Sequence, residues 1–301
     1  MICLVGTGMF LSADANQIGS SLSVSPQQLS DKISQIADSI TVKILDRDFL
    51  GSGFIAQKSG EKYLVVTNQH VLRAGDPPYI VETADGNTYL AKVVSQMSED
   101  NYSYDLAILE FEAENVYTTA KFGSSLYLEV GEPIFAAGFP YSPFTIGRSP
   151  AIFEPSTTGR SSELSLVSGR ITIILNQALE EGYQIGYTND VKKGMSGGPL
   201  LNSQGQVVGI NGKHAYPLWE SPEVYQDGSE PCPALQKLIT RSSLAIPIEK
   251  SIKLKPELKA SKSPGQSTNH SRLVTKNSQL TVKMQTEAQK TQQQCEGNTF
   301  D

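Results

Sequence analysis

Short apolar runs separated by glycine, proline and asparagine dominate the chain from about residue 40 to residue 250. Apolar runs of about four to eight residues bounded by such turn-forming residues are typical of β-strands. The clearest runs cover residues 41–45, 63–67, 89–94 and 106–111. Because many short strands follow one another with little helical pattern between them, we expect an all-β fold.

Helical periodicity is confined to two segments. In residues 27–40, Ile33, Ile36 and Ile40 recur at the spacing of one helix face, which predicts an amphipathic helix before the first strand. A second, shorter helix is expected over residues 232–240. The strands therefore carry the fold, and short helices accompany them.

The two ends of the chain differ from its centre. An apolar run over residues 2–11 precedes Ala13-Asp14-Ala15, which fits the small-x-small cleavage site of a signal peptide at residues 1–15. The basic segment that normally opens such a peptide is missing, so a start codon upstream and a buried N-terminal strand both remain open. The run is shorter than the roughly 20 residues of a membrane-spanning helix, so no stable membrane span is expected. We predict a secreted or periplasmic protein.

Residues 251–301 are rich in Lys, Ser, Thr, Gln and Asn, and their net charge is +4, whereas the remainder carries −10. Such a segment buries too little apolar area to offset the entropy of ordering it. We predict a disordered, basic and polar tail that acts as a solvated linker. Binding to a membrane surface or a nucleic acid is the alternative, and we expect no nucleic-acid partner.

The chain has 301 residues, of which 39% are hydrophobic, enough for a substantial core. Its three cysteines are Cys3, Cys232 and Cys295, and Cys3 would leave with the signal peptide. The other two can pair in an oxidising compartment, although sequence alone does not show whether they do. Their spacing matches no metal site, so we expect no metal.

Candidate chemistry begins at residues 194–199, Gly-Met-Ser-Gly-Gly-Pro. Glycine accepts backbone angles that other residues avoid, and in a tight turn the N–H groups of Gly194 and Ser196 can point at one spot. Two such donors form an oxyanion hole beside Ser196 as the nucleophile. Taken alone, this segment reads equally well as a glycine-rich turn.

Two more residues change that interpretation. His70 ends an apolar run, and Asp105 stands at the start of another, so the chain order is His70, Asp105, Ser196. A hydroxyl needs a base to take its proton, and imidazole suits that role, with an aspartate to orient it. Each residue alone has an ordinary reading, as a polar loop or a turn. Together, in this order, they predict a catalytic triad.

Further segments complete a resemblance to a known family. They are residues 51–55, 122–125, 130–133, 136–140, 205–211 and 244–248. With the triad, they resemble chymotrypsin-fold (trypsin-like) serine proteases of the bacterial type, nearest to the HtrA (Deg) and glutamyl-endopeptidase branches. The resemblance implies two packed six-stranded antiparallel β-barrels over residues 28–250, joined near 113–130. We expect no PDZ domain, since the polar tail is too short and too hydrophilic to form one.

The chain also departs from the animal members of that family. Met195 stands where trypsins carry an aspartate that pairs with a newly cut N-terminus, and methionine cannot form that ion pair. No cysteine flanks His70 or Ser196. We therefore expect no zymogen switch of the trypsin kind.

The resemblance indicates the specificity pocket less clearly than the triad. Asp190 has the spacing of the aspartate that selects Lys or Arg in trypsins, but bacterial relatives commonly place an aspartate near here for structural reasons, and we favour that structural role. Asn211 and His214 are candidates for the opposite wall, and glutamyl endopeptidases use a histidine near this point to receive acidic side chains. An ordinary surface position for His214 fits equally well, so the preferred substrate side chain stays open.

These observations predict a serine endopeptidase that acts on protein or peptide substrates through an acyl-enzyme, without a cofactor. A catalytically inactive or latent protease-like protein that binds peptides is the alternative. An esterase with the same three residues is disfavoured by chain order, because the esterase fold runs Ser, Asp, His.

Overall fold

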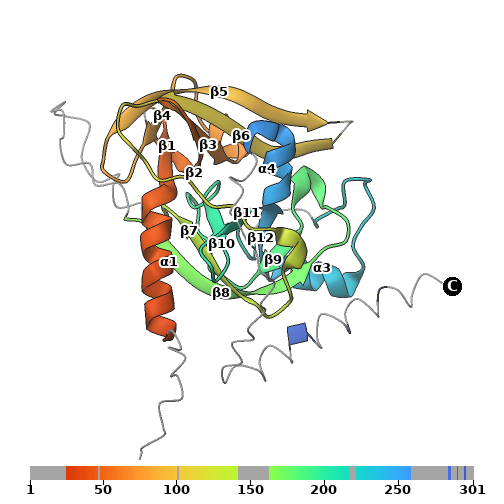
Figure 1. Cartoon of the computed structure of the whole chain (residues 1–301). Coiled ribbons are helices and arrows are strands. Elements are labelled where there is room, and N and C mark those ends of the chain that lie inside the picture. The colour runs from red at the N-terminus through yellow and green to blue at the C-terminus, as the bar shows by residue number, and fades with distance from the viewer. Residues whose placement is uncertain are drawn as a thin grey trace, which may run out of the picture.

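The structure of the chain is a computed structural model. It describes residues 25–46, 48–99, 102–141, 163–216 and 222–258, together with residues 284, 285, 290 and 295. The predicted signal peptide at residues 1–15 and most of the predicted tail lie outside the described residues. Within them, the apolar runs form strands that close into two antiparallel barrels, seen one above the other in Figure 1.

The first barrel is built from the N-terminal strands. They are β1 (Thr41–Leu45), β2 (Phe49–Ser59), β3 (Lys62–Thr67), β4 (Tyr79–Glu82), β5 (Thr88–Glu99) and β6 (Tyr102–Glu112). The strand order is β1-β2-β3-β6-β5-β4, and β1 pairs with β4 to close the barrel. Val42, Ile44, Val65 and Leu109 are among the apolar side chains that fill its interior.

The second barrel follows a linker that contains the 3-10 turn η1 (Ser125–Tyr127). Its strands are β7 (Pro133–Gly138), β8 (Ser165–Ile174), β9 (Ile185–Tyr187), β10 (Pro199–Leu201), β11 (Val207–Lys213) and β12 (Ser243–Pro247). Their order is β10-β11-β12-β9-β8-β7, and β7 pairs with β10. The predicted fold of two six-stranded antiparallel barrels is confirmed.

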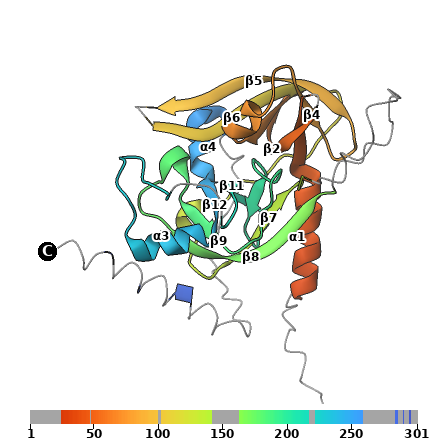
Figure 2. The ribbon, with the colours of Figure 1, turned by 180° about the vertical axis from the view of Figure 1, so that it is seen from behind.

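The helices lie at the edges and junctions of the barrels. They are α1 (Pro26–Ile40), α2 (Gln69–Arg73), α3 (Pro233–Thr240) and α4 (Ile248–Leu254), with the 3-10 turns η3 (Glu180–Gly182) and η4 (Pro256–Leu258). Helix α1 begins with a capping box between Ser25 and Gln28, which satisfies backbone N–H groups at the helix start. Helix α4 contacts β5 of the first barrel and β11 and β12 of the second (Figure 2).

One core joins the two barrels. Phe54 and Leu106 of the first barrel and Leu201 and Ile246 of the second belong to a single buried cluster, which α1 extends through Ile33 and its neighbours. Leu258, after α4, is only 2% exposed and belongs to the same cluster, so the packed structure continues past residue 250. In the part of the chain described, no helix is both long and apolar enough to cross a membrane.

Candidate active site

Strand pairing brings His70 and Asp105 to one end of the first barrel. Thr67, the last residue of β3, pairs with Ala107 of the antiparallel strand β6. His70 lies just beyond Thr67 in the one-turn helix α2, and Asp105 lies just before Ala107. Since antiparallel neighbours run in opposite directions, both residues reach the same edge.

The carboxylate of Asp105 holds the imidazole at two points. Its Oδ2 atom lies 2.5 Å from His70 Nδ1, and its Oδ1 atom accepts the His70 backbone N–H at 2.7 Å. The Asp105 side chain is 1% exposed and that of His70 40% exposed. Because Nδ1 faces the carboxylate, Nε2 is the ring nitrogen left to act on another group.

Two further residues face the same carboxylate. The hydroxyl of Tyr183 donates to Asp105 Oδ2 at 2.5 Å, and the Arg73 guanidinium lies 3.8 Å from Oδ1. Burial by itself raises the pKa of the Asp105 carboxyl, but hydrogen bonds from His70 and Tyr183 and the His70 charge outweigh it and lower the pKa below its usual value. Asp105 is therefore an anion at neutral pH. No motif marks Tyr183 in the sequence, so it was not among the predicted site residues.

The loop before Ser196 is a tight turn that requires glycine. The Met195 N–H donates to the Lys192 carbonyl at 3.0 Å, and Gly194, the third residue of this turn, has φ +93°. A positive φ at the third position is the mark of a type II turn. A side chain at Gly194 would also meet the backbone of Phe139 and Tyr141.

The orientation of one peptide group determines where the Gly194 N–H points. The carbonyl of Lys193 accepts the Tyr141 N–H at 2.7 Å. In a trans peptide the C=O and the following N–H point in opposite directions, so the Gly194 N–H points away from Tyr141. The N–H groups of Gly194 and Ser196 donate to no acceptor within the described residues.

The Ser196 loop lies against the strands that lead to His70. The Ser196 carbonyl accepts the N–H of Ser52, on β2, at 2.9 Å. Gly197, with φ +84°, packs so closely on Ser52, Thr67 and Asn68 that a side chain there would meet all three. The structure thus brings the predicted nucleophile to the barrel end that carries His70 and Asp105.

The hydroxyl of Ser196 has a backbone partner in this structure. It donates to the Gly212 carbonyl at 3.0 Å. Among the described residues, no hydrogen bond joins it to His70, whose ring contacts Asp105. Apo structures commonly show such loosened catalytic hydrogen bonds.

Met195 anchors the same loop to the core of the second barrel. Its side chain is completely buried in the second barrel with Ile134, Leu200 and Val208. Gly138 leaves room for it, since a side chain at Gly138 would meet Met195 Cα at 2.7 Å. Apolar burial therefore holds the position where trypsins use an ion pair. The expectation that no zymogen switch exists stays a prediction.

The residues predicted for the specificity pocket do not converge. The Asp190 side chain is 79% exposed and lies 3.7 Å from Lys192, so it offers no buried carboxylate to a basic substrate side chain. Asn211 is fully buried, and its amide donates to the Ala137 and Pro199 carbonyls, as a structural residue does. His214 is exposed just beyond β11. No cluster of three His, Cys, Asp or Glu residues able to hold a metal occurs in the described regions.

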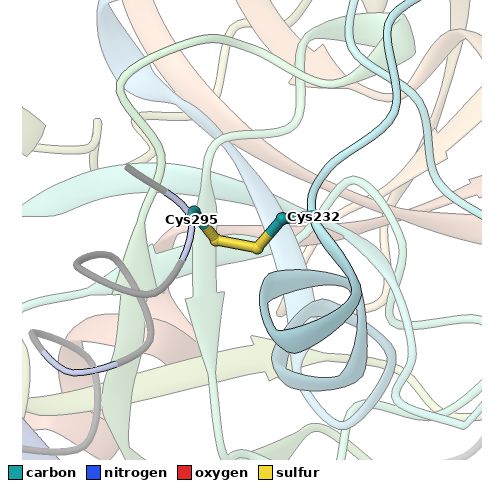
Figure 3. Close-up of a disulfide and its surroundings, with 2 residues drawn as sticks. All are labelled: Cys232 and Cys295. Atoms are coloured by element: carbon teal, nitrogen blue, oxygen red, sulfur yellow. A yellow bond between two sulfur atoms is a disulfide. The ribbon is translucent and has the colours of Figure 1, made fainter. Parts of the chain in front are cut away.

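The structure answers whether the two cysteines pair, which the sequence did not show. Cys232, which precedes α3, and Cys295 form a disulfide with their Cα atoms 5.7 Å apart (Figure 3). Residue 295 is thereby attached to the second barrel beside α3.

Comparison with known proteins shows which family the sequence resembles. A family model described as a trypsin-like peptidase domain matches residues 51–210, which include His70, Asp105 and Ser196. The chain is 35% identical over 162 residues to the serine protease Do-like HtrA of Lactobacillus helveticus, covering 54% of this chain and 35% of that one. It is 34% identical over 160 residues to the serine protease Do-like HtrB of Bacillus subtilis, covering 53% and 32%.

A third relative is the probable periplasmic serine endoprotease DegP-like of Pseudomonas fulva. The chain is 33% identical to it over 162 residues, covering 54% of this chain and 28% of the relative. The match thus spans about a third of the length of these relatives.

Proposed function

The chain belongs to the trypsin-like peptidase family, and from that premise we propose that it is a serine endopeptidase acting on protein or peptide substrates. The observation that carries the proposal is the hydrogen-bonded His70–Asp105 pair beside a serine loop whose Gly194 and Ser196 N–H groups have no internal acceptor in the described structure. This arrangement supplies a base and two donors for developing negative charge.

In the first half of the proposed reaction, Ser196 Oγ bonds to the carbonyl carbon of the peptide while His70 Nε2 takes the hydroxyl proton. The N–H groups of Gly194 and Ser196 hold the resulting oxyanion. The C–N bond then breaks, and His70 gives its proton to the leaving amine. In the attack step the Ser196 hydroxyl leaves the Gly212 carbonyl, its partner in the structure, and turns toward His70.

In the second half, water attacks the acyl carbon and His70 takes one of its protons. The ester C–O bond breaks, the proton returns to Ser196 Oγ, and the carboxylic acid leaves. Asp105 keeps Nε2 free to accept by holding the Nδ1 proton, and its negative charge stabilises the imidazolium formed in each half.

We also propose that the protein works outside the cytoplasm. The Cys232–Cys295 disulfide supports this, because disulfides persist mainly in oxidising compartments. One relative carries the word periplasmic in its name. The apolar run at residues 2–11 is consistent with export.

One observation favours a second candidate function. Because the Ser196 hydroxyl donates to Gly212 and makes no hydrogen bond to His70 within the described residues, a latent or inactive protein that only binds peptides fits the same fold. The two functions differ in whether Ser196 is nucleophilic.

Covalent labelling with a fluorophosphonate probe distinguishes them. The wild-type protein should be labelled and should cleave fluorescein-casein, whereas Ser196→Ala should do neither while keeping its melting temperature. Ser203→Ala, in the turn between β10 and β11, is the control and should be labelled like the wild type. A folded wild-type protein that is neither labelled nor active would support the peptide-binding alternative.

A further inference from the structure

Tyr183 reaches Asp105 from the second barrel. It lies between η3 and β9, is completely buried, and donates its hydroxyl to Asp105 Oδ2 at 2.5 Å. The same oxygen accepts from His70 Nδ1, and Oδ1 accepts the His70 backbone N–H. The triad proposed above thus has a contact from a residue that none of its motifs contains.

We propose that Tyr183 is a positioning residue for the reaction, holding the Asp105 carboxylate in the orientation that keeps His70 ready to accept a proton from Ser196. The inference rests on the proposed function and adds a residue to it. Tyr183 acts through Asp105 and touches neither the substrate nor the reacting atoms.

The geometry supports this role because rotation about the last side-chain bond of an aspartate is broad and weakly restrained. Two hydrogen bonds from His70 hold the carboxylate from within the first barrel. The Tyr183 hydroxyl adds a donor from the opposite barrel, so turning the carboxylate would break a hydrogen bond in a buried site. Losing a hydrogen bond to a buried charge is costly.

A glycine provides the space for this contact. A side chain at Gly212 would meet the hydroxyl and the ring atoms Cε1 and Cζ of Tyr183. The carbonyl of the same Gly212 accepts the Ser196 hydroxyl. Because residue 212 has no side chain, the phenol of Tyr183 has space to reach Asp105. The backbone of the same residue contacts Ser196.

Burial and the neighbouring carboxylates keep the phenol of Tyr183 protonated, and Lys213 packs on its ring. The Lys213 ammonium lies 4.9 Å from the centre of the Tyr183 ring and is paired with both oxygens of Glu223 at 2.9 Å. Burial, followed by the Asp105 charge, raises the pKa of Tyr183 well above its usual value, and Glu181 and Glu223 add to the effect. Tyr183 is therefore a hydrogen-bond donor throughout the working pH range.

The test measures fluorophosphonate labelling of Ser196 against pH, which requires no knowledge of the substrate. In labelling, Ser196 Oγ bonds to phosphorus, the P–F bond breaks, fluoride leaves and His70 takes the proton. The acid limb of the rate profile therefore reports on the His70–Asp105 pair. The Asp105 carboxylate also faces the Arg73 guanidinium, which is itself paired with Glu181.

Tyr183→Phe removes only the hydroxyl. Without that donor, the negative charge of Asp105 is no longer partly neutralised by the Tyr183 hydroxyl and attracts the imidazolium more strongly. We therefore expect the acid limb of the rate profile to move to higher pH by about 0.5–1 unit. Looser orientation should also lower the maximal rate about tenfold, less than the 10²–10⁴ that general-base catalysis contributes as a whole. Gly212→Ala, which displaces the phenol, should shift the limb in the same direction.

Tyr187→Phe is the matched control, because Tyr187 is also completely buried, lies on β9 and donates its hydroxyl to Asn211 at 2.9 Å. It should lose similar stability and leave the acid limb unmoved. A folded Tyr183→Phe protein with the wild-type profile would overturn the positioning role, as would an equal shift in Tyr187→Phe. Failure of the wild type to be labelled would instead overturn the proposed function.

Discussion

Ser52 of the first barrel donates its hydroxyl to the carbonyl oxygen of Gly194, 2.7 Å away in the nucleophile loop of the second barrel. The same hydroxyl accepts the Phe139 N–H at 2.8 Å, and the Ser52 N–H donates to the Ser196 carbonyl at 2.9 Å. One serine on β2 thus holds the loop of the proposed nucleophile against the barrel that carries His70. The relative position of base and nucleophile depends on this junction.

Ser52→Ala should therefore weaken both stability and activity. The substitution leaves the buried Gly194 carbonyl and Phe139 N–H without their side-chain partner, which costs about 1–3 kcal/mol for each unsatisfied group. Urea unfolding and the fluorophosphonate labelling rate measure the two effects. Ser59→Ala, at the exposed end of the same strand, should change neither. Wild-type values for Ser52→Ala would show that the junction does not depend on this hydroxyl.

Gly194→Ala should lower the labelling rate by about 10²–10³, the usual loss for one oxyanion donor. The substitution strains the φ of +93° and brings a methyl group onto the backbone of Phe139 and Tyr141, so the turn cannot keep its N–H in place. Gly60→Ala is the control, because Gly60 has φ +64° with nothing within 4 Å. Gly60→Ala should lower the stability and leave the labelling rate unchanged. Equal labelling rates for Gly194→Ala and Gly60→Ala would contradict the proposed oxyanion hole.

Asp105→Asn should reduce the labelling rate by about 10⁴ at neutral pH. The amide no longer stabilises an imidazolium, and its NH₂ group favours the wrong tautomer of His70, with the proton on Nε2. The test is the labelling rate of Asp105→Asn, measured on protein whose folding has been checked by circular dichroism. A loss below about tenfold would mean that His70 does not act through Asp105.

The same carboxyl should contribute to the pH dependence of stability. Its pKa is lowered in the folded protein, whereas the unfolded value is about 3.9. A lowered pKa stabilises the fold above the unfolded value, and this contribution is lost as pH falls through the folded pKa. The free energy of unfolding of the wild type should thus decline more steeply below about pH 4 than that of Asp105→Asn. Urea titrations at several pH values measure this free energy. An equal decline in the wild type and in Asp105→Asn would contradict the prediction.

The disulfide should be present in the purified protein and should stabilise it. A non-reducing digest analysed by mass spectrometry should contain Cys232 linked to Cys295. These residues are 63 apart in sequence, and cross-links of this kind typically contribute about 2–4 kcal/mol. Cys295→Ser should lose about that amount, and adding reductant should then change its stability no further. An effect of reductant on the variant equal to that on the wild type would point to another cause.

Much of the fold was predictable because its signals are local. The strand expected at residues 41–45 is β1 (Thr41–Leu45), and the helix expected at 27–40 is α1 (Pro26–Ile40). The sequence also predicted His70, Asp105 and Ser196 as candidates, because each stands in a motif of neighbouring residues. The pocket prediction was weaker, since spacing along the chain did not show that Asp190 is exposed and Asn211 buried.

The sequence by itself determined the strand pattern, the glycines that a tight turn requires, and the order of the three candidate residues, because those properties depend on near neighbours in the chain. Only the tertiary structure decided that Tyr183 reaches Asp105, that Ser52 holds Gly194 and that Gly212 makes room for a phenol. These contacts join residues from different barrels or distant strands. They exist only once both barrels have closed and packed, so no local pattern of side chains records them.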